Sequence, residues 1–141
     1  MRILLTGANG YVGRRLLPEL LSQGHEVICC VRDSIRLGLD PHTVSLVTIW
    51  EVDFLEEVNF ENCPKSVDIA YFLIHSMSSS TDTFDAMEAK TAQNFNLYSA
   101  HMNINQVIYL SGIVNDPKLS KHMQSRNNVE KILFQGKPNL T

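Results

Sequence analysis

The sequence predicts an α/β fold, a doubly wound parallel sheet of about five strands with helices on both faces. Short apolar runs alternate with longer segments in which apolar residues recur every three or four positions. The first run, residues 2–6, is apolar on both faces, as expected for a central parallel strand. We expect the 141 residues to form one domain, residues 1–141, which is the N-terminal part of a longer protein.

The first half of the chain is predicted to contain three strands, at residues 2–6, 26–31 and 44–50. Between the first two, residues 11–23 place leucine and valine side chains on one helical stripe, and Gly24 follows as a stop signal. A helical turn is expected at 33–38 and a short helix near 54–60.

The second half is predicted to alternate in the same way. Residues 67–74 and 106–111 are apolar strands. The segment 83–102 has helical period, and its Met and Phe side chains are expected to be core residues rather than cofactor contacts. A last helix is expected at 121–135, ended by Gly136 and Pro138.

The order of the strands decides which strand lies at the edge. In a sheet of order 3-2-1-4-5-6, the strand 106–111 is followed by a sixth strand, and the sequence stops at 138–141, where that strand would begin. We therefore expect strand 106–111 to be an edge. An apolar edge pairs readily with another chain, which predicts a homo-oligomer through this strand.

Composition excludes several classes of protein. The net charge is −3, with 44% hydrophobic and 19% charged residues, which is typical of a globular domain and gives no sign of nucleic-acid binding. No apolar run approaches the roughly 18 residues of a membrane span. The three cysteines Cys29, Cys30 and Cys63 form no CxxC pair, so we expect no metal site but buried reduced thiols, and a cytoplasmic location.

Residues 6–13 read Thr-Gly-Ala-Asn-Gly-Tyr-Val-Gly, directly after the first strand. In a strand-turn-helix, Gly7 permits the tight turn, Gly10 allows close approach of a pyrophosphate, and Gly13 allows the helix to pack closely. The helix N-terminus supplies unpaired N–H groups and a partial positive charge for the phosphates. The pattern predicts a dinucleotide site, the alternative being a loop that merely needs glycine.

The spacing Thr-Gly-x-x-Gly-x-x-Gly resembles the short-chain dehydrogenase/reductase superfamily in its extended and atypical branches. The segments 31–33 (Val-Arg-Asp), 53–54 (Asp-Phe), 71–76 (Tyr-Phe-Leu-Ile-His-Ser) and 109–112 (Tyr-Leu-Ser-Gly) strengthen the resemblance. Within the superfamily the chain is most similar to the NmrA-like, NAD(P)-binding group, which is nucleoside-diphosphate-sugar epimerase-like. The resemblance implies a Rossmann-type fold.

The resemblance also implies the cofactor-binding residues, several of which have a second interpretation. Asp53 would contact the adenine, or equally cap a helix at 54–60. His75 would line the ribose side, or be a local hydrogen-bonding residue. The implied residues are Thr6, Gly7, Asn9, Gly10, Tyr11, Val12, Gly13, Arg32, Asp53, Phe54, Leu73, Ile74 and His75.

The end of the second strand favours NADP over NAD. Arg32 stands nineteen residues after Gly13, and a guanidinium binds a 2′-phosphate in bidentate fashion. Arg14 and Arg36 add to the cluster, whereas Asp33 favours the ribose hydroxyls of NAD. The alternative is that Arg32 is a solvated surface residue.

The superfamily's catalytic groups are only partly present. Ser111 occupies the position of the usual serine after strand five, although it is equally interpretable as a simple strand-end hydroxyl. The usual Tyr-x-x-x-Lys is absent, since no tyrosine follows Tyr109. Aligning the last helix places His122 at the tyrosine position and Arg126 at the lysine position, where histidine exchanges protons near neutral pH and arginine holds a ribose or phosphate. His122 is also interpretable as an exposed helix-start residue.

Two functions are consistent with these residues. The first is an NAD(P)-dependent oxidoreductase or nucleotide-sugar epimerase-like enzyme, acting on an unknown small-molecule substrate held by a lobe after residue 141. The second is an NAD(P)-sensing regulatory module without turnover, which the missing tyrosine favours. A third interpretation, a nucleotide-free structural domain, requires the glycine turn to be vestigial.

Overall fold

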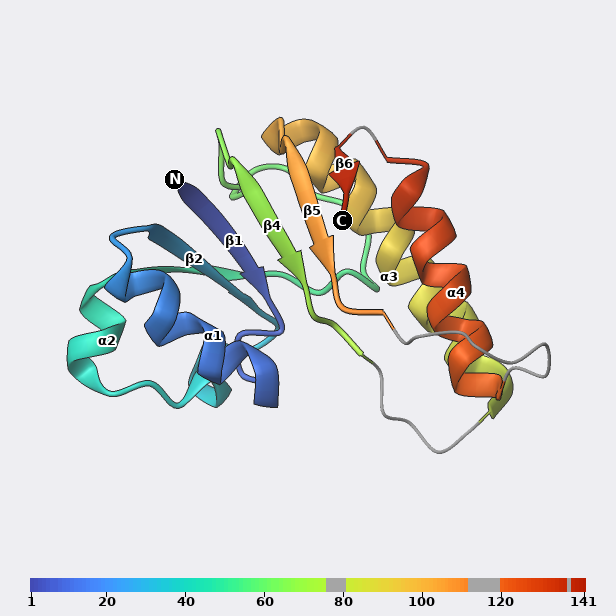
Figure 1. Ribbon diagram of the computed structural model, residues 1–141, viewed down its shortest axis with the longest axis horizontal. Helices are drawn as coiled ribbons and strands as arrows, with labels where there is room; N and C mark the ends of the chain where they lie inside the picture. The colour runs from blue at the N-terminus through green and yellow to red at the C-terminus, as the bar shows by residue number, and fades with distance from the viewer. Residues whose placement is uncertain (76–80, 112–119, 137) are drawn as a thin grey trace.

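The computed structural model describes residues 1–75, 81–111, 120–136 and 138–141, with the backbone alone at residues 81, 82, 121 and 122 (Figure 1). The strands are β1 (Arg2–Thr6), β2 (Glu26–Val31), β3 (Val47–Glu51), β4 (Ile69–Phe72), β5 (Gln106–Tyr109) and β6 (Asn139–Leu140). The helices are α1 (Tyr11–Ser22), the 3-10 turn η1 (Ser34–Leu37), α2 (Pro41–Ser45), α3 (Thr81–Met102) and α4 (Lys121–Phe134).

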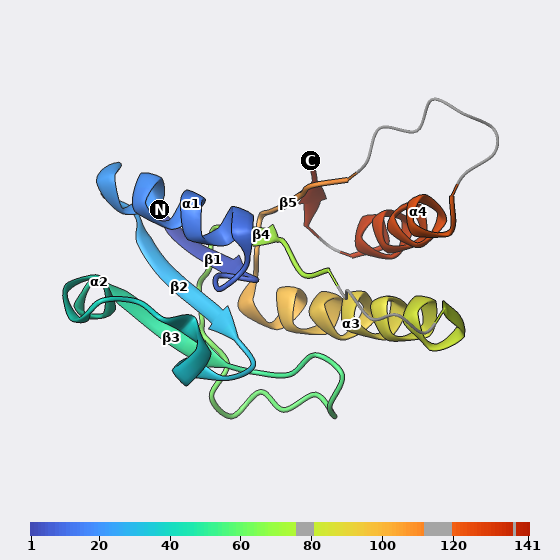
Figure 2. The same ribbon diagram turned by 90° about the horizontal axis from the view of Figure 1, so that it is seen from below.

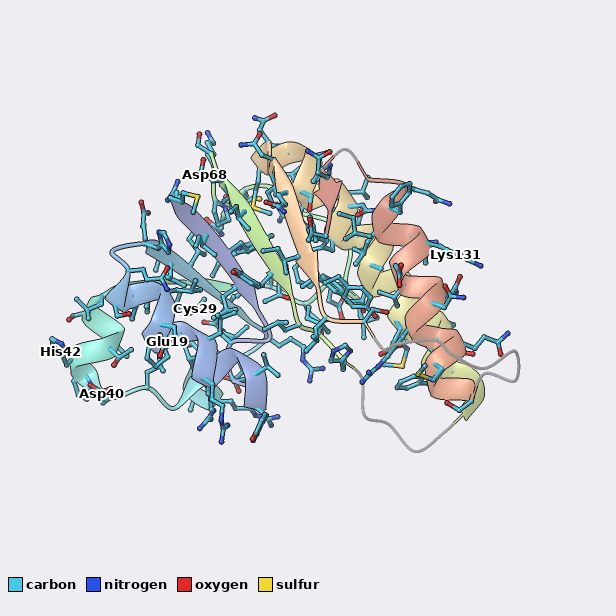
Figure 3. All side chains as sticks on the ribbon, viewed as in Figure 1. Glu19, Cys29, Asp40, His42, Asp68 and Lys131 are labelled. Carbon is cyan, nitrogen blue, oxygen red and sulfur yellow. The ribbon has the colours of Figure 1, made fainter. Side chains whose placement is uncertain are left out.

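The described strands form one parallel sheet in the order β3-β2-β1-β4-β5-β6, which confirms the predicted fold class. From β1 the chain moves outward to β2 and β3, and then crosses to β4 on the other side of β1. The carboxyl ends of β1 and β4 therefore border the crevice where ligands bind in such sheets. Asp68, whose carboxylate accepts the N–H of Arg2 at 2.7 Å, lies at the opposite end of the sheet (Figure 3).

The sheet has a separate core on each face, because neighbouring residues of a strand point to opposite sides. Cys29 packs with Leu17 and Leu20 of α1, whereas Cys30 belongs to the cluster that contains Phe95 of α3. Figure 2 shows α1 and α3 on opposite sides of the sheet. The adjacent cysteines are thus both buried, one in each core.

The helix α4 packs beside α3, on the same side of the sheet. Val129 and Leu133 of α4 join the core cluster of α3, and the side chain of Asn96 donates to the carbonyl of Ile132 at 2.7 Å. This packing brings α4 alongside the carboxyl end of β5.

The third strand begins later than its sequence pattern predicts. The stretch 41–45, which we expected to lead into strand 44–50, contains the short helix α2 instead. The Asp40 carboxylate accepts hydrogen bonds from the backbone N–H and the hydroxyl of Thr43, at 3.1 and 2.6 Å, and Pro41 occupies the first turn. This N-cap starts a helix, although the β-branched residues of the segment favour a strand in the sequence pattern.

The predicted helix at 54–60 is wrong, because the chain makes only a turn there. The side-chain amide of Asn94 on α3 donates to the carbonyls of Phe54 and Glu56, at 2.6 and 3.1 Å, and the Tyr98 hydroxyl accepts the N–H of Asn59 at 2.9 Å. Bonds to α3 thus take the place of bonds within a helix.

The prediction that the fifth strand is an edge is also wrong. β6 pairs with β5 in parallel, and the N–H of Thr141 donates to the carbonyl of Val107 at 2.9 Å. In return the N–H of Tyr109 donates to the carbonyl of Thr141 at 2.9 Å. The ground for expecting an oligomer through β5 therefore disappears.

None of the helices in the described part of the chain combines the length and apolar character that crossing a membrane requires.

Candidate functional site

The turn after β1 has a backbone conformation that requires glycine. Gly7 has φ of +65°, and a Cβ placed there would lie 2.8 Å from the carbonyl oxygen of Leu73. The turn therefore lies directly against the end of β4, where that residue follows the strand. A side chain at position 7 would be both strained and in steric conflict.

Gly13 permits an even closer approach. A Cβ at this position would lie 2.3 Å from the carbonyl oxygen of Gly7 and 2.9 Å from Cα of Ala8. The first turn of α1 consequently packs directly on the backbone of the loop that precedes it. This close packing aims the helix N-terminus at the crevice.

The N-terminus of α1 is open to an anion. Gly10 is the N-cap residue and offers no side chain to accept the first N–H groups of the helix. Tyr11 and Val12 are 74% and 39% exposed, so the first turn is accessible to solvent. The arrangement supplies the N–H groups and the positive helix end that bind a phosphate.

Thr6 supports this turn from within the sheet. Its side chain is fully buried, and its hydroxyl donates to the carbonyl of Tyr71 at 2.9 Å and accepts the N–H of Leu73 at 3.0 Å. Thr6 thus fastens the end of β1 to the end of β4 and has no surface on the crevice.

The end of β2 presents Arg32 to solvent, with Asp33 bound locally. One oxygen of Asp33 accepts the N–H of Ile35 at 3.0 Å, and the other lies 3.5 Å from Nε of Arg36. Arg14 donates to the carbonyl of Asn9 at 3.0 Å, and its guanidinium reaches the vicinity of Gly38. The predicted arginine cluster therefore surrounds one loop, with Arg36 partly neutralised by Asp33.

Ile35 is a residue of this loop that sequence reasoning missed. It lies on η1, and it is 90% exposed. An apolar side chain so exposed at the rim of the crevice offers a flat contact for an aromatic base. The only signal in the sequence is an isoleucine within a polar stretch.

Asp53 and Phe54 follow β3 and have local roles. The Asp53 carboxylate accepts the N–H of Leu55 at 2.9 Å, so it caps a turn. Phe54 is 4% exposed and packs edge-on against Trp50 and Tyr98. The structure therefore places Phe54 in the core, and Asp53 alone lies partly exposed.

Leu73, Ile74 and His75 lie half-buried at the end of β4. Burial lowers the pKa of His75, the positive charge of Arg126 lowers it further, and Glu88 opposes both. The imidazole is therefore neutral at neutral pH, and its ring centroid lies 6.3 Å from that of Tyr109.

The end of β5 meets α4 through side chains. The hydroxyl of Ser111 donates to a carboxylate oxygen of Glu130 at 3.0 Å. Arg126, one turn earlier on α4, is half-buried. His122 lies on the same helix, but its side chain is outside the described residues. Glu130 was not foreseen, although its spacing of four from Arg126 places both on one helix face.

Tyr109, the last tyrosine of the chain, is not positioned for proton transfer. It is 8% exposed, and its hydroxyl donates to the backbone carbonyl of Arg126 at 3.4 Å. Burial raises its pKa to about 12, with further upward contributions from Glu88 and Glu130 and an opposing one from Arg126. The tyrosine therefore remains protonated and structural.

A buried polar pair joins α3 to α4 beneath these groups. Glu88 is 7% exposed and Ser125 is 3% exposed, and the Ser125 hydroxyl donates to the Glu88 carboxylate at 2.5 Å. Such a pair is costly to bury without its hydrogen bond. It helps to fix the position of α4 relative to α3.

Among the described residues no three His, Cys, Asp or Glu side chains are grouped as metal ligands. The three cysteines are free and buried. Burial raises the pKa of Cys29 and of Cys63 to about 11, and it raises that of Cys30 still more.

Comparison with known proteins now identifies the family. The model of the NAD dependent epimerase/dehydratase family matches residues 3–124, from β1 into α4. The chain belongs to this family. The match includes the glycine turn, the end of β2 and Ser111.

Relatives and solved structures agree with this assignment. The dTDP-6-deoxy-L-talose 4-dehydrogenase (NAD(+)) of Aggregatibacter actinomycetemcomitans is 49% identical over 43 residues, 30% of this chain and 14% of that protein. An NAD-dependent epimerase/dehydratase from Bacillus halodurans superposes with a TM-score of 0.76 at 22% identity, over 99% of this chain and 67% of that one. The Bordetella bronchiseptica enzyme WbmG, in complex with NAD and UDP, has a TM-score of 0.73 at 15% identity, over 99% of this chain and 51% of that one.

The chain thus spans a small part of that curated relative and about half of WbmG. At such identities the superpositions establish the fold alone. The more specific NmrA-like assignment stays a prediction.

Proposed function

We propose that this chain is the dinucleotide-binding domain of an NAD(P)-dependent oxidoreductase or nucleotide-sugar epimerase-like enzyme. The observation that carries the proposal is the glycine turn, in which Gly13 packs on Gly7 and Gly7 lies against the carbonyl of Leu73 at the sheet's switch point. A Cβ at either glycine would collide with the backbone of this turn, which we call the cofactor cradle (residues 7–13). Family membership supports the same conclusion.

The residues present fit a dinucleotide. The N–H groups at Tyr11 and Val12 would hold the pyrophosphate at the start of α1, with Asn9 beside them. The N–H of Gly10 already donates to the carbonyl of Gly7 at 2.9 Å. Ile35 would contact the adenine ring, and Asp53 would contact the edge of that ring. When bound, the nicotinamide ring supplies a hydride donor or acceptor.

Ile74 and His75 would border the nicotinamide side of the crevice, because they follow β4 directly. His75, held neutral by burial and by Arg126, would serve as a hydrogen-bonding group there rather than as a cation. Ser111 and Arg126 lie beyond it, at the end of β5 and on α4.

NADP is the cofactor that the end of β2 favours. Arg32 is exposed, while the carboxylate of Asp33 is already bound to the N–H of Ile35 and lies beside Arg36. That carboxylate is therefore engaged before a ribose arrives. A guanidinium next to it supplies two parallel donors for a 2′-phosphate.

For the substrate we propose a nucleoside-diphosphate sugar. The talose dehydrogenase named above acts on such a compound, and the WbmG structure contains UDP. The substrate lobe would be provided by residues outside this chain, and the enzyme would work in the cytoplasm.

Calorimetric titration of NADPH and NADH tests the cofactor proposal. We expect NADPH to bind at least about tenfold more tightly, because charge-assisted hydrogen bonds to the 2′-phosphate are worth roughly 1.5–3 kcal/mol. Arg32→Ala should remove most of this preference and leave NADH binding unchanged. Lys131→Ala, which removes a cation on α4, is the matched control (Figure 3). Equal affinities for the two cofactors in the wild-type protein would contradict the NADP preference.

A regulatory module that binds NAD(P) without turnover is the second candidate. The buried, protonated state of Tyr109 favours it, because no ionisable tyrosine lies at the end of β5 among the described residues. Oxidation of dTDP-6-deoxy-L-talose by NADP⁺, measured in the whole protein with its substrate lobe, separates the two functions. Turnover supports the enzyme, whereas binding without turnover supports the module.

A further inference from the structure

The contact between Ser111 and Glu130 joins two groups of complementary chemistry. Ser111 stands just beyond β5, at the carboxyl edge of the sheet, and its hydroxyl donates to Oε2 of Glu130 at 3.0 Å. This distance lies within the range for direct proton transfer. The carboxylate accepts, so the serine proton already points toward its acceptor.

In the part of the chain that the structure describes, Glu130 supplies the carboxylate to which Ser111 donates. The Tyr109 hydroxyl is bound to the carbonyl of Arg126 within the core. Glu88 is buried on α3 and bound by Ser125. The ring of His75, at the end of β4, lies beside that of Tyr109, with 6.3 Å between the ring centroids. Glu130 is exposed, so a proton that it receives can pass on to solvent.

Arg126 completes the arrangement from the preceding turn of α4. It is half-buried and lies within electrostatic reach of both His75 and Tyr109. A fixed positive charge at this place stabilises an oxygen that gains negative charge. Arginine keeps its proton throughout, which leaves proton transfer to the serine and the carboxylate.

We propose that Ser111 and Glu130 form the proton-transfer pair of this site for the interconversion of a secondary alcohol and a ketone, which rests on the proposed function. In the oxidation, Ser111 Oγ takes the proton of the substrate hydroxyl while its own proton passes to Glu130 Oε2. The substrate C–H bond breaks, and its hydrogen leaves with both electrons to an oxidised nicotinamide dinucleotide. The products are the ketone, the reduced dinucleotide and a protonated Glu130, and reduction follows the same steps in reverse.

The experiment measures oxidation of dTDP-6-deoxy-L-talose by NADP⁺ against pH. It uses the whole protein with its substrate lobe, as the wild type and as Glu130→Gln, Glu130→Asp and Ser111→Ala. We expect Glu130→Gln to lower kcat by about 100-fold or more and to abolish the acid limb of the pH profile. Ser111→Ala should lower kcat similarly, and Glu130→Asp should restore part of the rate and the limb. Dissociation constants for NADP⁺, measured separately by fluorescence, should be the same in all four proteins.

Glu19→Gln, which alters an exposed glutamate on α1, is the control and should match the wild type (Figure 3). A Glu130→Gln variant with wild-type rate and pH profile overturns the pair. So does a whole wild-type protein that binds NADP⁺ but gives no turnover, and in that case the proposed cofactor binding still stands. Failure of the wild type to bind NADP⁺ overturns the proposed function itself.

Discussion

The cofactor cradle and the edge formed by β5 and α4 are built in different ways. In the cradle, Gly7 and Gly13 leave no room for a Cβ, and the groups offered to a ligand are backbone N–H groups. At the other edge, Ser111, Arg126 and Glu130 act through side chains carried by separate elements. A backbone site restricts the residue type at each position, whereas a side-chain site restricts only the final geometry.

The two regions also differ in how fully they match the pattern that the sequence resembles. The cradle has all three glycines of that pattern, and a Cβ at Gly7 or Gly13 would lie 2.8 or 2.3 Å from a main-chain oxygen. The β5–α4 edge retains a serine but lacks the usual tyrosine and lysine. The hydroxyl of this serine is instead hydrogen-bonded to Glu130, which lies one turn after Arg126 on α4.

The most severe test of the cradle is Gly13→Ala. The new Cβ would meet the carbonyl oxygen of Gly7 at 2.3 Å, so the turn and α1 must move apart. We expect a loss of about 3 kcal/mol in the free energy of unfolding, and at least about a 100-fold loss in NADPH affinity, since displaced N–H groups no longer meet the pyrophosphate. Urea unfolding and calorimetry measure the two effects.

Gly24→Ala is the matched control for this variant. Unlike Gly13, Gly24 has a positive φ, of +76°, and nothing lies within 4 Å of its Cβ position. It should therefore lose only about 1 kcal/mol from backbone strain and bind NADPH normally. Equal loss of cofactor affinity in both variants would mean that the cradle does not depend on close backbone packing.

Ser125→Ala tests the support of the opposite edge. The variant removes the 2.5 Å hydrogen bond to the buried carboxylate of Glu88. We expect a loss of about 2 kcal/mol in unfolding free energy, while NADPH affinity stays at the wild-type value. Ser22→Ala on the exposed face of α1 should change stability by less than about 0.5 kcal/mol. A stability loss in Ser22→Ala as large as that in Ser125→Ala would show that burial of the pair is unimportant.

A smaller effect is expected at two buried cysteines, Cys29 on β2 and Cys63 between β3 and β4. Burial raises the pKa of Cys29 and Cys63 from 9.0 to about 11, so at pH 8 the folded protein holds about 100-fold less thiolate than the unfolded chain. Alkylation by iodoacetamide should slow accordingly in the folded state. Because the folded pKa values are raised, stability should also fall as pH rises from 9 to 11. Rapid alkylation of the folded protein at pH 8 would mean that Cys29 and Cys63 are not enclosed in the two cores.

Local pattern predicted the parts of the fold that depend on local causes. The strand order, the glycine turn and the alternation of Cys29 and Cys30 follow from the period of the apolar residues and from parallel-sheet topology. The helix expected at 54–60 failed because Asn94, forty residues away, binds the carbonyls of that segment. The pairing of β6 with β5 was also missed, because a strand of two residues is too short to show a pattern in the sequence.

The residues of the candidate site also fall into those that a local pattern predicts and those that depend on distant contacts. Gly7, Gly10 and Gly13 were readable because the backbone dictates them. The hydrogen bonds from Thr6 to Tyr71 and from Ser111 to Glu130 depend on contacts between elements distant in sequence. Such contacts leave no periodic signal. The sequence therefore suggested a cofactor contact for Thr6, and for Ser111 either the usual catalytic serine or a simple strand-end hydroxyl, without its partner Glu130.

The most direct test of the cradle is a titration of the ¹⁵N-labelled chain with NADP⁺, followed by amide resonances. We expect saturable shifts concentrated at residues 7–13, with a second group around Arg32, and little change at the exposed turn of α4 around Lys131. Absence of shifts at the glycine turn under saturating NADP⁺, or shifts confined to other parts of the sheet, would contradict the assignment of this turn as the dinucleotide cradle.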